Sequence, residues 1–234
     1  MRIVVGCPVK DRDWIFDLWF DYVYAAVPDE WDLDFVFIIP EGDPCNEIAR
    51  ERMTDGSLIV TTKEKRPDYI RNWSAQRYVE MVHLRNLLLN NVRTVHPDIF
   101  LSLDSDILLH RDALRLGYET LVEHNWDCVS IPTFLTPNGG ERFTNSAALR
   151  KRGYMLDRDK IGATNVTDVA MAAKIMRSSA YNCDYQTHHL GEDTGWSCNV
   201  KEAGLTIGWA GEVPISKHVM DKKFLDIVDK RCGY

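Results

Sequence analysis

The strongest constraint in this chain is a mostly apolar run, 99–103, that ends directly in Asp104 and Asp106. Such a run reads as a buried β-strand, and in open α/β sheets ligands bind at the carboxyl ends of the strands. Two carboxylates so close repel each other unless a cation or an arginine neutralises them. Their oxygen atoms suit Mn²⁺ or Mg²⁺ shared with substrate phosphates. An exposed turn at a strand end is the alternative, because Asp-x-Asp is a common sequence.

Apolar runs alternate with helical patterns along the whole chain, which predicts an α/β fold with a largely parallel sheet. A loop is expected at 133–145, which is rich in Pro, Gly, Asn and Thr. Strands are expected at 2–7, 34–39, 58–61, 99–103 and 127–131, with a final strand pair at 205–215, and helices at 14–26, 69–92, 114–124 and 191–203.

Composition favours one globular domain without a membrane span. The 234 residues are 45% hydrophobic, which suffices for a proper core. The net charge of −7 gives no overall attraction to nucleic acid or to anionic membranes. No apolar run is long enough for a signal or transmembrane segment. The six scattered cysteines suit reduced thiols, so a soluble, cytoplasmic protein is expected.

The helix expected at 69–92 places Arg85 inside an apolar stripe. An arginine on a core-facing stripe is costly without an anionic partner. Arg85 is therefore expected to reach toward Asp104 and Asp106, or toward a bound diphosphate. Snorkelling to solvent and a purely structural ion pair are the alternatives.

Two further groups are candidates for chemistry. Glu192 and Asp193 fall in the first turn of a helix, where interaction with the helix dipole stabilises acidic residues by about 0.3–1 kcal/mol each. Besides that capping role, they could supply a general base or an acceptor-binding carboxylate. His218 follows the last expected strand and could join Asp104 and Asp106 at a cation, although a lone histidine is more often structural, and His188–His189 compete for the role.

In this order, the features resemble the GT-A glycosyltransferases: a first strand and loop, an Arg85-Asn86 helix, Asp-x-Asp, a Glu-Asp helix and a C-terminal histidine. Residues 84–88 and 103–106 look most similar to the Anp1-type mannosyltransferases of fungi, but this chain is shorter and lacks their membrane anchor. We treat that as similarity of the core and not as an indication of mannose.

The resemblance implies a Rossmann-like GT-A fold in which residues 1–110 bind a UDP- or GDP-sugar and 111–234 bind an acceptor hydroxyl. It implies Mn²⁺ or Mg²⁺ held by Asp104, Asp106 and His218. Asp193 would be the base of an inverting enzyme, with Glu192 orienting the acceptor, or would bind the acceptor in a retaining one. The positions implied for donor binding are Pro8, Lys10, Arg12, Asp34 (or Asp68), Arg85, Asn86 and Asp104.

Three other functions fit less well. A nucleotidyltransferase needs a Gly-rich basic loop after its first strand, where this chain has Cys-Pro-Val-Lys at 7–10. A phosphatase with a nucleophilic Asp-x-Asp would normally carry it after the first strand. A non-catalytic carbohydrate-binding protein would bind sugars without turning over a donor. The basic segment 141–160 could meet a polyanion such as modified DNA, but a solvated loop is the simpler interpretation, so a nucleic-acid acceptor is not favoured.

Overall fold

The computed structural model describes residues 1–63, 75–135, 143–144, 150–151, 154–155, 162–169 and 172–225. The strands are β1 (Arg2–Pro8), β2 (Asp32–Pro40), β3 (Leu58–Thr62), β4 (Ile99–Leu103), β5 (Ile107–Leu108), β6 (Cys128–Ser130), β7 (Thr133–Leu135), β8 (Phe143–Thr144), β9 (Arg150–Lys151), β10 (Tyr154–Met155), β11 (Ala163–Val166), β12 (Ala173–Arg177), β13 (Ile207–Ala210) and β14 (Ser216–His218). The helices are α1 (Asp13–Ala26), α2 (Cys45–Arg52), α3 (Ala75–Val95), α4 (Ala113–Glu123), α5 (Ser178–Tyr181), α6 (Glu192–Glu202) and a 3-10 turn, Lys222–Phe224.

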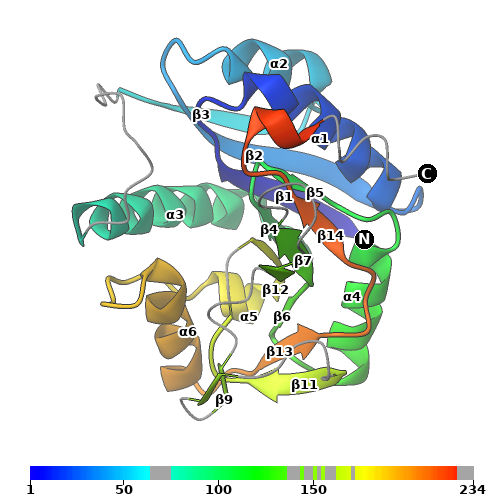
Figure 1. The fold of residues 1–234 in the computed structure, drawn as a ribbon, viewed down its shortest axis with the longest axis vertical. Helices are drawn as coiled ribbons and strands as arrows, with labels where there is room; N and C mark the ends of the chain where they lie inside the picture. The colour runs from blue at the N-terminus through cyan, green and yellow to red at the C-terminus, as the bar shows by residue number, and fades with distance from the viewer. Residues whose placement is uncertain are drawn as a thin grey trace.

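An eight-stranded sheet forms the centre of the molecule, in the order β11-β13-β6-β12-β4-β1-β2-β3 (Figure 1). Strands β4, β1, β2 and β3 run parallel to one another, whereas β12 pairs antiparallel with both β4 and β6. A four-stranded sheet, β5-β14-β7-β8, lies beside it. The predicted α/β class with a mostly parallel sheet is therefore confirmed.

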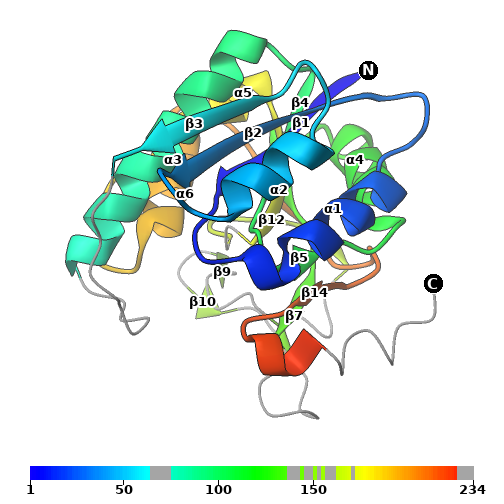
Figure 2. The same cartoon turned by 90° about the horizontal axis from the view of Figure 1, so that it is seen from above.

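Helices cover both faces of the large sheet. Figure 2 shows β1 to β3 between α1 and α2 on one side and α3 on the other. Alternate residues of a strand point to opposite faces, and accordingly Val5 packs with the α1 side while Val4 packs with the α3 side. Since both faces are buried, the parallel strands consist of nearly continuous apolar runs.

The aromatic residues of α1 and β2 fill the layer between these two elements. The rings of Phe16 and Phe37 meet edge to face at a centroid distance of 5.2 Å, and Trp19 and Phe20 do so at 5.3 Å. This packing fixes α1 against the sheet and holds the loop that precedes it, residues 9–12, at the carboxyl end of β1.

Several expectations about secondary structure were wrong. The structure adds α2, α5, β5, β9, β10, β11 and β12, none of which was predicted. The segment 133–145 is not only loop, because it contains β7 and β8. The final strands do not pair with each other: β13 lies between β11 and β6 in the large sheet, and β14 lies between β5 and β7 in the small one. Whether these segments form strands, and in which sheet, depends on pairing partners far apart in sequence, which local patterns do not encode.

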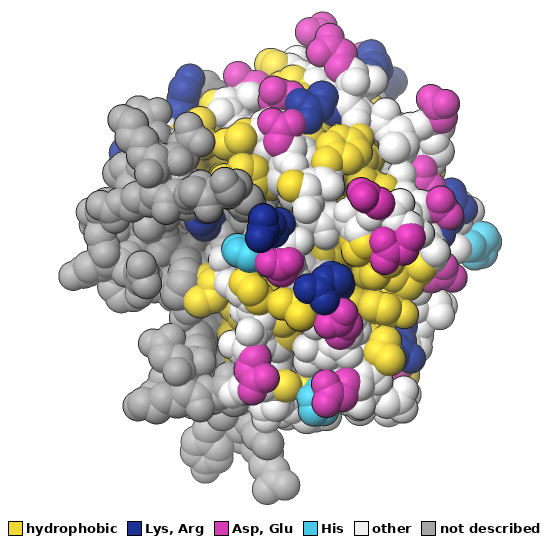
Figure 3. Space-filling view, turned by 90° about the vertical axis from the view of Figure 1, so that its right-hand side faces the viewer, with side chains coloured by type: hydrophobic (Ala, Val, Ile, Leu, Met, Phe, Trp, Pro, Cys, Tyr) yellow, Lys and Arg dark blue, Asp and Glu magenta, His cyan; other side chains and the backbone are white. Residues whose placement is uncertain are grey.

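The described surface is mixed in charge. On the side that carries α4, acidic and basic side chains are interspersed with apolar ones (Figure 3). No helix among the described residues is long and apolar enough to cross a membrane. The cysteines within the described residues form no disulfide bond; these are Cys7, Cys45, Cys128, Cys183 and Cys198.

Gly6 is the position at which β1 and β2 approach too closely for a side chain. A Cβ atom there would lie 2.1 Å from the backbone oxygen of Val36. Gly6→Ala should therefore cost about 1–3 kcal/mol of unfolding free energy, as overpacking of a core does. Urea denaturation measures this loss, and a cost below about 0.5 kcal/mol would show that the strands can separate freely.

Candidate active site

Asp104 and Asp106 follow β4 directly, and their backbone positions are fixed by three separate elements. The Trp19 indole Nε1 donates to the Asp104 oxygen at 3.1 Å, and the Asp104 nitrogen donates to the Ala172 oxygen at 3.0 Å. The Val219 nitrogen donates to the Asp106 oxygen at 2.8 Å. The turn between the two aspartates is thus held by α1, by the residue before β12 and by the end of β14.

The Asp104 carboxylate pairs with Arg85 of α3. Its Oδ1 atom accepts a hydrogen bond from Arg85 Nη2 at 2.7 Å, and Arg85 Nη1 lies 3.4 Å from Ser102 Oγ. Arg85 is 3% exposed, whereas the Asp104 side chain is 30% exposed. Burial alone would lower the pKa of Arg85, but Asp104 raises it, so the guanidinium stays charged. Arg85 therefore reaches Asp104, as expected, and does not snorkel to solvent; this contact is also compatible with a purely structural ion pair.

The Asp106 carboxylate lies between Arg12 and His218. Arg12 Nη2 is 3.1 Å from Asp106 Oδ2, and His218 Nε2 is 3.2 Å from Asp106 Oδ1. Burial opposes ionisation of Asp106, yet the contact with His218 and the charge of Arg12 lower its pKa. Burial likewise opposes protonation of His218, and Asp106 raises its pKa. This carboxylate is therefore ionised despite being 5% exposed.

The donor atoms at this edge fit a divalent cation only in part. Among the residues that the structure describes, no three His, Cys, Asp or Glu side chains are arranged to hold a metal ion. Asp106 and His218 nevertheless present a carboxylate oxygen and an imidazole nitrogen side by side. Mg²⁺-type sites commonly use one or two carboxylates and complete the shell with water and substrate phosphates. Asp106 and His218 could therefore supply two ligands to a cation of that kind, and water and substrate would have to supply the others.

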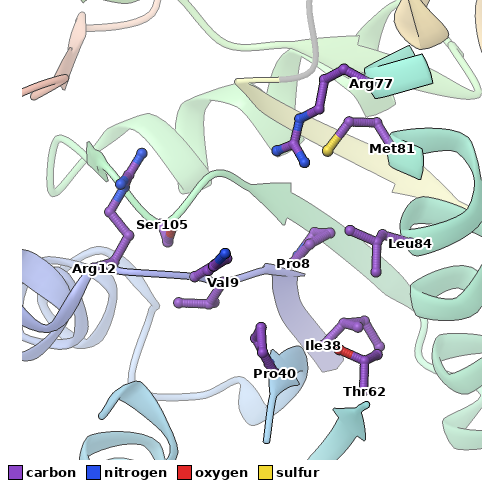
Figure 4. A pocket seen from close by; sticks show the side chains of 11 residues that line it. Pro8, Val9, Arg12, Ile38, Pro40, Thr62, Arg77, Met81, Leu84 and Ser105 are labelled. Atoms are coloured by element: carbon purple, nitrogen blue, oxygen red, sulfur yellow. The ribbon is translucent and has the colours of Figure 1, made fainter. Parts of the chain in front are cut away.

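A pocket opens beside the two aspartates, at the carboxyl ends of β1, β2 and β3 (Figure 4). Arg12 connects the two features, because it lines the pocket and also contacts Asp106. The described lining contains three cationic side chains and no carboxylate, which favours an anionic ligand with an apolar part. The lining residues are Pro8, Val9, Lys10, Arg12, Ile38, Pro40, Thr62, Arg77, Met81, Leu84 and Ser105.

The loop that forms one wall of this pocket is held by backbone hydrogen bonds. The Val9 nitrogen donates to the Ile38 oxygen at 2.9 Å, and the Asp11 nitrogen donates to Asp43 Oδ2 at 2.9 Å. Asp43 also accepts from the Cys45 nitrogen at the start of α2. The position of Arg12 is therefore set by a backbone hydrogen bond to β2 and by the Asp43 side chain before α2.

Glu192 and Asp193 lie in the first turn of α6, near the Arg85 side of the site. Gly191 precedes them with φ of 116°, a conformation that favours glycine. Burial and the charge of Glu192 raise the pKa of Asp193 to about 8, although Lys174 and Arg85 act in the opposite direction. A carboxylate with a pKa near the working pH is suited to general-base catalysis.

Comparison with known proteins gives a fold but no sequence family. The chain matches no protein-family model and no curated protein. S. aureus TarS residues 1–349 in complex with UDP-GlcNAc has a TM-score of 0.61 and 13% identity, over 93% of this chain and 58% of that one. The mannosyltransferase PcManGT from Pyrobaculum calidifontis, in complex with GDP-Man and Mn²⁺, has a TM-score of 0.57 and 14% identity, over 95% and 57%. The fold is that of the GT-A glycosyltransferases. This chain spans less than two thirds of either structure.

Within this GT-A fold, the structure brings together Pro8, Lys10, Arg12, Arg85, Asp104, Asp106 and His218, with Glu192 and Asp193 on the neighbouring helix. It does not bring Asp34 there. Asp34 lies near the amino end of β2, where its Oδ2 atom pairs with Arg2 at 2.8 Å and its Oδ1 atom accepts from Thr54. Because β2 and β4 run in the same direction, this is the opposite edge of the sheet from Asp104.

Asn86 has a structural role in this GT-A fold. Its Nδ2 atom donates to the Tyr185 oxygen at 3.0 Å, and its Oδ1 atom accepts from the Tyr185 nitrogen at 2.7 Å. Asn86 thus ties α3 to the segment before α6. The rings of His188 and His189 contact each other before α6, tilted by 34°. Asp68 and most of the basic segment 141–160 lie outside the described residues.

Two residues at the site of this GT-A fold were missed from the sequence. Arg77 lines the pocket from the first turn of α3. Lys174 is fully buried in β12, beside the helix that carries Asp193. A lysine inside the apolar run 169–176 was a signal that could have revealed both β12 and an internal charge.

The Arg85–Asp104 pair should respond asymmetrically to substitution. Asp104→Ala leaves a buried guanidinium unpaired, which costs about 3–5 kcal/mol for a fully buried pair. Arg85→Met replaces the buried charge with an apolar side chain and leaves Asp104 partly exposed to water, so it should cost clearly less. Guanidinium denaturation measures both losses.

The matched control is Arg115→Met, which breaks the exposed pair between Arg115 and Glu119 and should cost at most about 1 kcal/mol. The double variant Arg85→Met/Asp104→Ala should be more stable than the sum of the single losses predicts. Equal losses for the two single variants would contradict the burial asymmetry.

Proposed function

We propose that this chain is a metal-dependent glycosyltransferase that transfers a sugar from a UDP- or GDP-sugar to a hydroxyl acceptor. The observation that carries this proposal is the convergence of Asp104, Asp106, Arg12 and His218 beside a cationic pocket at one edge of the sheet. The complexes of TarS with UDP-GlcNAc and of PcManGT with GDP-Man support it, because both share the fold.

The donor would bind across the pocket and the aspartates. Ile38, Met81 and Leu84 offer apolar contacts for a nucleoside. Lys10, Arg12 and Arg77 supply positive charge for the diphosphate, and arginine matches phosphate geometry well. Asp34 and Asn86 have other partners, and we leave them out of the donor site.

Asp106 and His218, with Asp104 nearby, are the residues that would hold Mn²⁺ or Mg²⁺. When bound, such a cation offsets the negative charge that develops on the leaving diphosphate. The guanidinium of Arg12 pairs with Asp106 and also lines the pocket, so it can contact the diphosphate from the same position.

Asp193 would act on the acceptor. In an inverting reaction the acceptor oxygen would attack the anomeric carbon as the bond from that carbon to the nucleoside diphosphate breaks. The acceptor proton would pass to the Asp193 carboxylate, while Glu192 orients the acceptor. In a retaining reaction Asp193 would bind the acceptor instead. Residues 1–110 would then hold the donor and residues 111–234 the acceptor, within a single domain. A polynucleotide acceptor is not favoured, because the chain is acidic overall.

Removal of the metal tests the donor site. EDTA should abolish turnover, and Mn²⁺ or Mg²⁺ should restore it. Asp106→Ala should lose the Mn²⁺-dependent part of UDP or GDP binding in isothermal titration calorimetry while remaining folded. Glu119→Ala, which removes an exposed carboxylate paired with Arg115, is the control and should bind as the wild type does. Undiminished Mn²⁺-dependent binding by Asp106→Ala would exclude Asp106 as a ligand.

Substitution of Asp193 tests the base. A positioned base typically contributes 10²–10⁴-fold, so Asp193→Asn should lower kcat by about that factor and leave the donor Kd unchanged. Because the pKa of Asp193 is about 8, the wild-type rate should rise as the pH approaches 8 and then level off. Glu202→Gln, in the last turn of the same helix, is the control. A kcat for Asp193→Asn within a few-fold of wild type would rule out Asp193 as the base.

A further inference from the structure

Lys174 is a charged side chain in the middle of the protein. It belongs to β12, where it is paired with Ser102 of β4 and Ser130 of β6, and it is 0% exposed. Its neighbours Ala173 and Ile175 face the α1 side of the sheet, so the lysine faces the α3 and α6 side. A buried ammonium is costly without compensation, which calls for an explanation of this residue.

The ammonium group of Lys174 lies against an aromatic ring. Its Nζ atom lies 3.6 Å from the centroid of the Trp196 ring and 5.9 Å from that of Tyr185. Among the described residues, Nζ has no hydrogen-bond partner. A cation over an indole face is stabilised by the ring quadrupole, more strongly when water is excluded. The contact therefore fixes the ammonium against α6 without neutralising it.

Trp196 lies three residues after Asp193, so the ammonium is held beneath the first turn of α6. We propose that Lys174 is a positioning residue whose buried ammonium, stacked on Trp196, opposes protonation of the Asp193 carboxylate and so increases the fraction that can accept a proton at a given pH. This inference rests on the proposed role of Asp193 as the base. Burial and Glu192 disfavour the ionised carboxylate of Asp193, whereas Lys174 favours it.

The charges around this pair come from several elements, and Arg85 is a second cation acting on both groups. It favours ionised Asp193 but opposes the charged form of Lys174, whose pKa burial lowers to about 8. Arg85 differs from Lys174 in having a direct carboxylate partner, Asp104. The other titratable groups that face the pair are Cys128 of β6, Asp168, Tyr185 and Glu192, together with Asp104 at the end of β4.

The pH dependence of the reaction tests this inference. Lys174→Met replaces the lysine with an unbranched apolar side chain that is one atom shorter, and it removes the charge. It should shift the acid limb of the plot of kcat/KM against pH to higher pH by about one unit. Activity at pH 7 should then fall about tenfold, with the donor Kd unchanged. Lys174→Arg retains a cation and should keep the limb near its wild-type position. Lys201→Met, an exposed lysine on the same helix, is the matched control and should change nothing.

A second measurement does not depend on activity. Since folding raises the pKa of Asp193 above that of the unfolded chain, the fold loses stability as the pH rises from about 4 until Asp193 is ionised. The unfolding free energy of Asp193→Asn, relative to that of the protein with Asp193, should therefore increase with pH. In the wild-type background this difference should level off near pH 8. In the Lys174→Met background it should level off at a higher pH.

The two measurements separate the two proposals. If the levelling pH is the same in both backgrounds, or if Lys174→Met lowers the rate equally at every pH, the inference about Lys174 is wrong, whether or not the protein transfers sugar. If the levelling pH shifts but no nucleotide sugar is turned over by the wild type, the coupling between Lys174 and Asp193 stands and the proposed function fails.

Discussion

The balance of charge at the end of β4 is the constraint on which the rest of the site depends. A strand buried on both faces delivers two carboxylates to one edge of the sheet, and their mutual repulsion must be offset. Arg85 offsets Asp104 from α3, while Arg12 and His218 offset Asp106 from the first loop and from β14. Each partner comes from a different part of the chain, so the charges can meet only when the whole domain is folded.

The same balance extends into the second half of the protein. Arg85 pairs with Asp104, and its charge also affects the proton affinity of Asp193 and that of Lys174. The proposed donor site and the proposed base are therefore not electrostatically independent. A ligand that adds negative charge near Arg12 and Arg85 would be expected to raise the proton affinity of Asp193.

Local sequence patterns predicted much of this arrangement. The strand 99–103 and its aspartates were recognisable because an apolar run ended in two charges, and Arg85 because it interrupted an apolar stripe. Asp34 was a poor candidate for a reason the sequence already contained: it lies near the start of its strand, whereas Asp104 follows the end of a parallel one. Asn86 contacts Tyr185, about 100 residues away, and Lys174 contacts Trp196, about 20 residues away. The spacing of residues in the sequence does not encode those contacts.

The most direct test of the account is a crystal structure of the protein with Mn²⁺ and UDP or GDP. We expect an anomalous manganese peak next to Asp106 and His218, with the diphosphate between this ion and Arg12 and the nucleoside in the pocket lined by Ile38 and Met81. A manganese ion bound elsewhere, or a nucleotide outside this edge of the sheet, would contradict the proposal that the carboxyl end of β4 is the donor site.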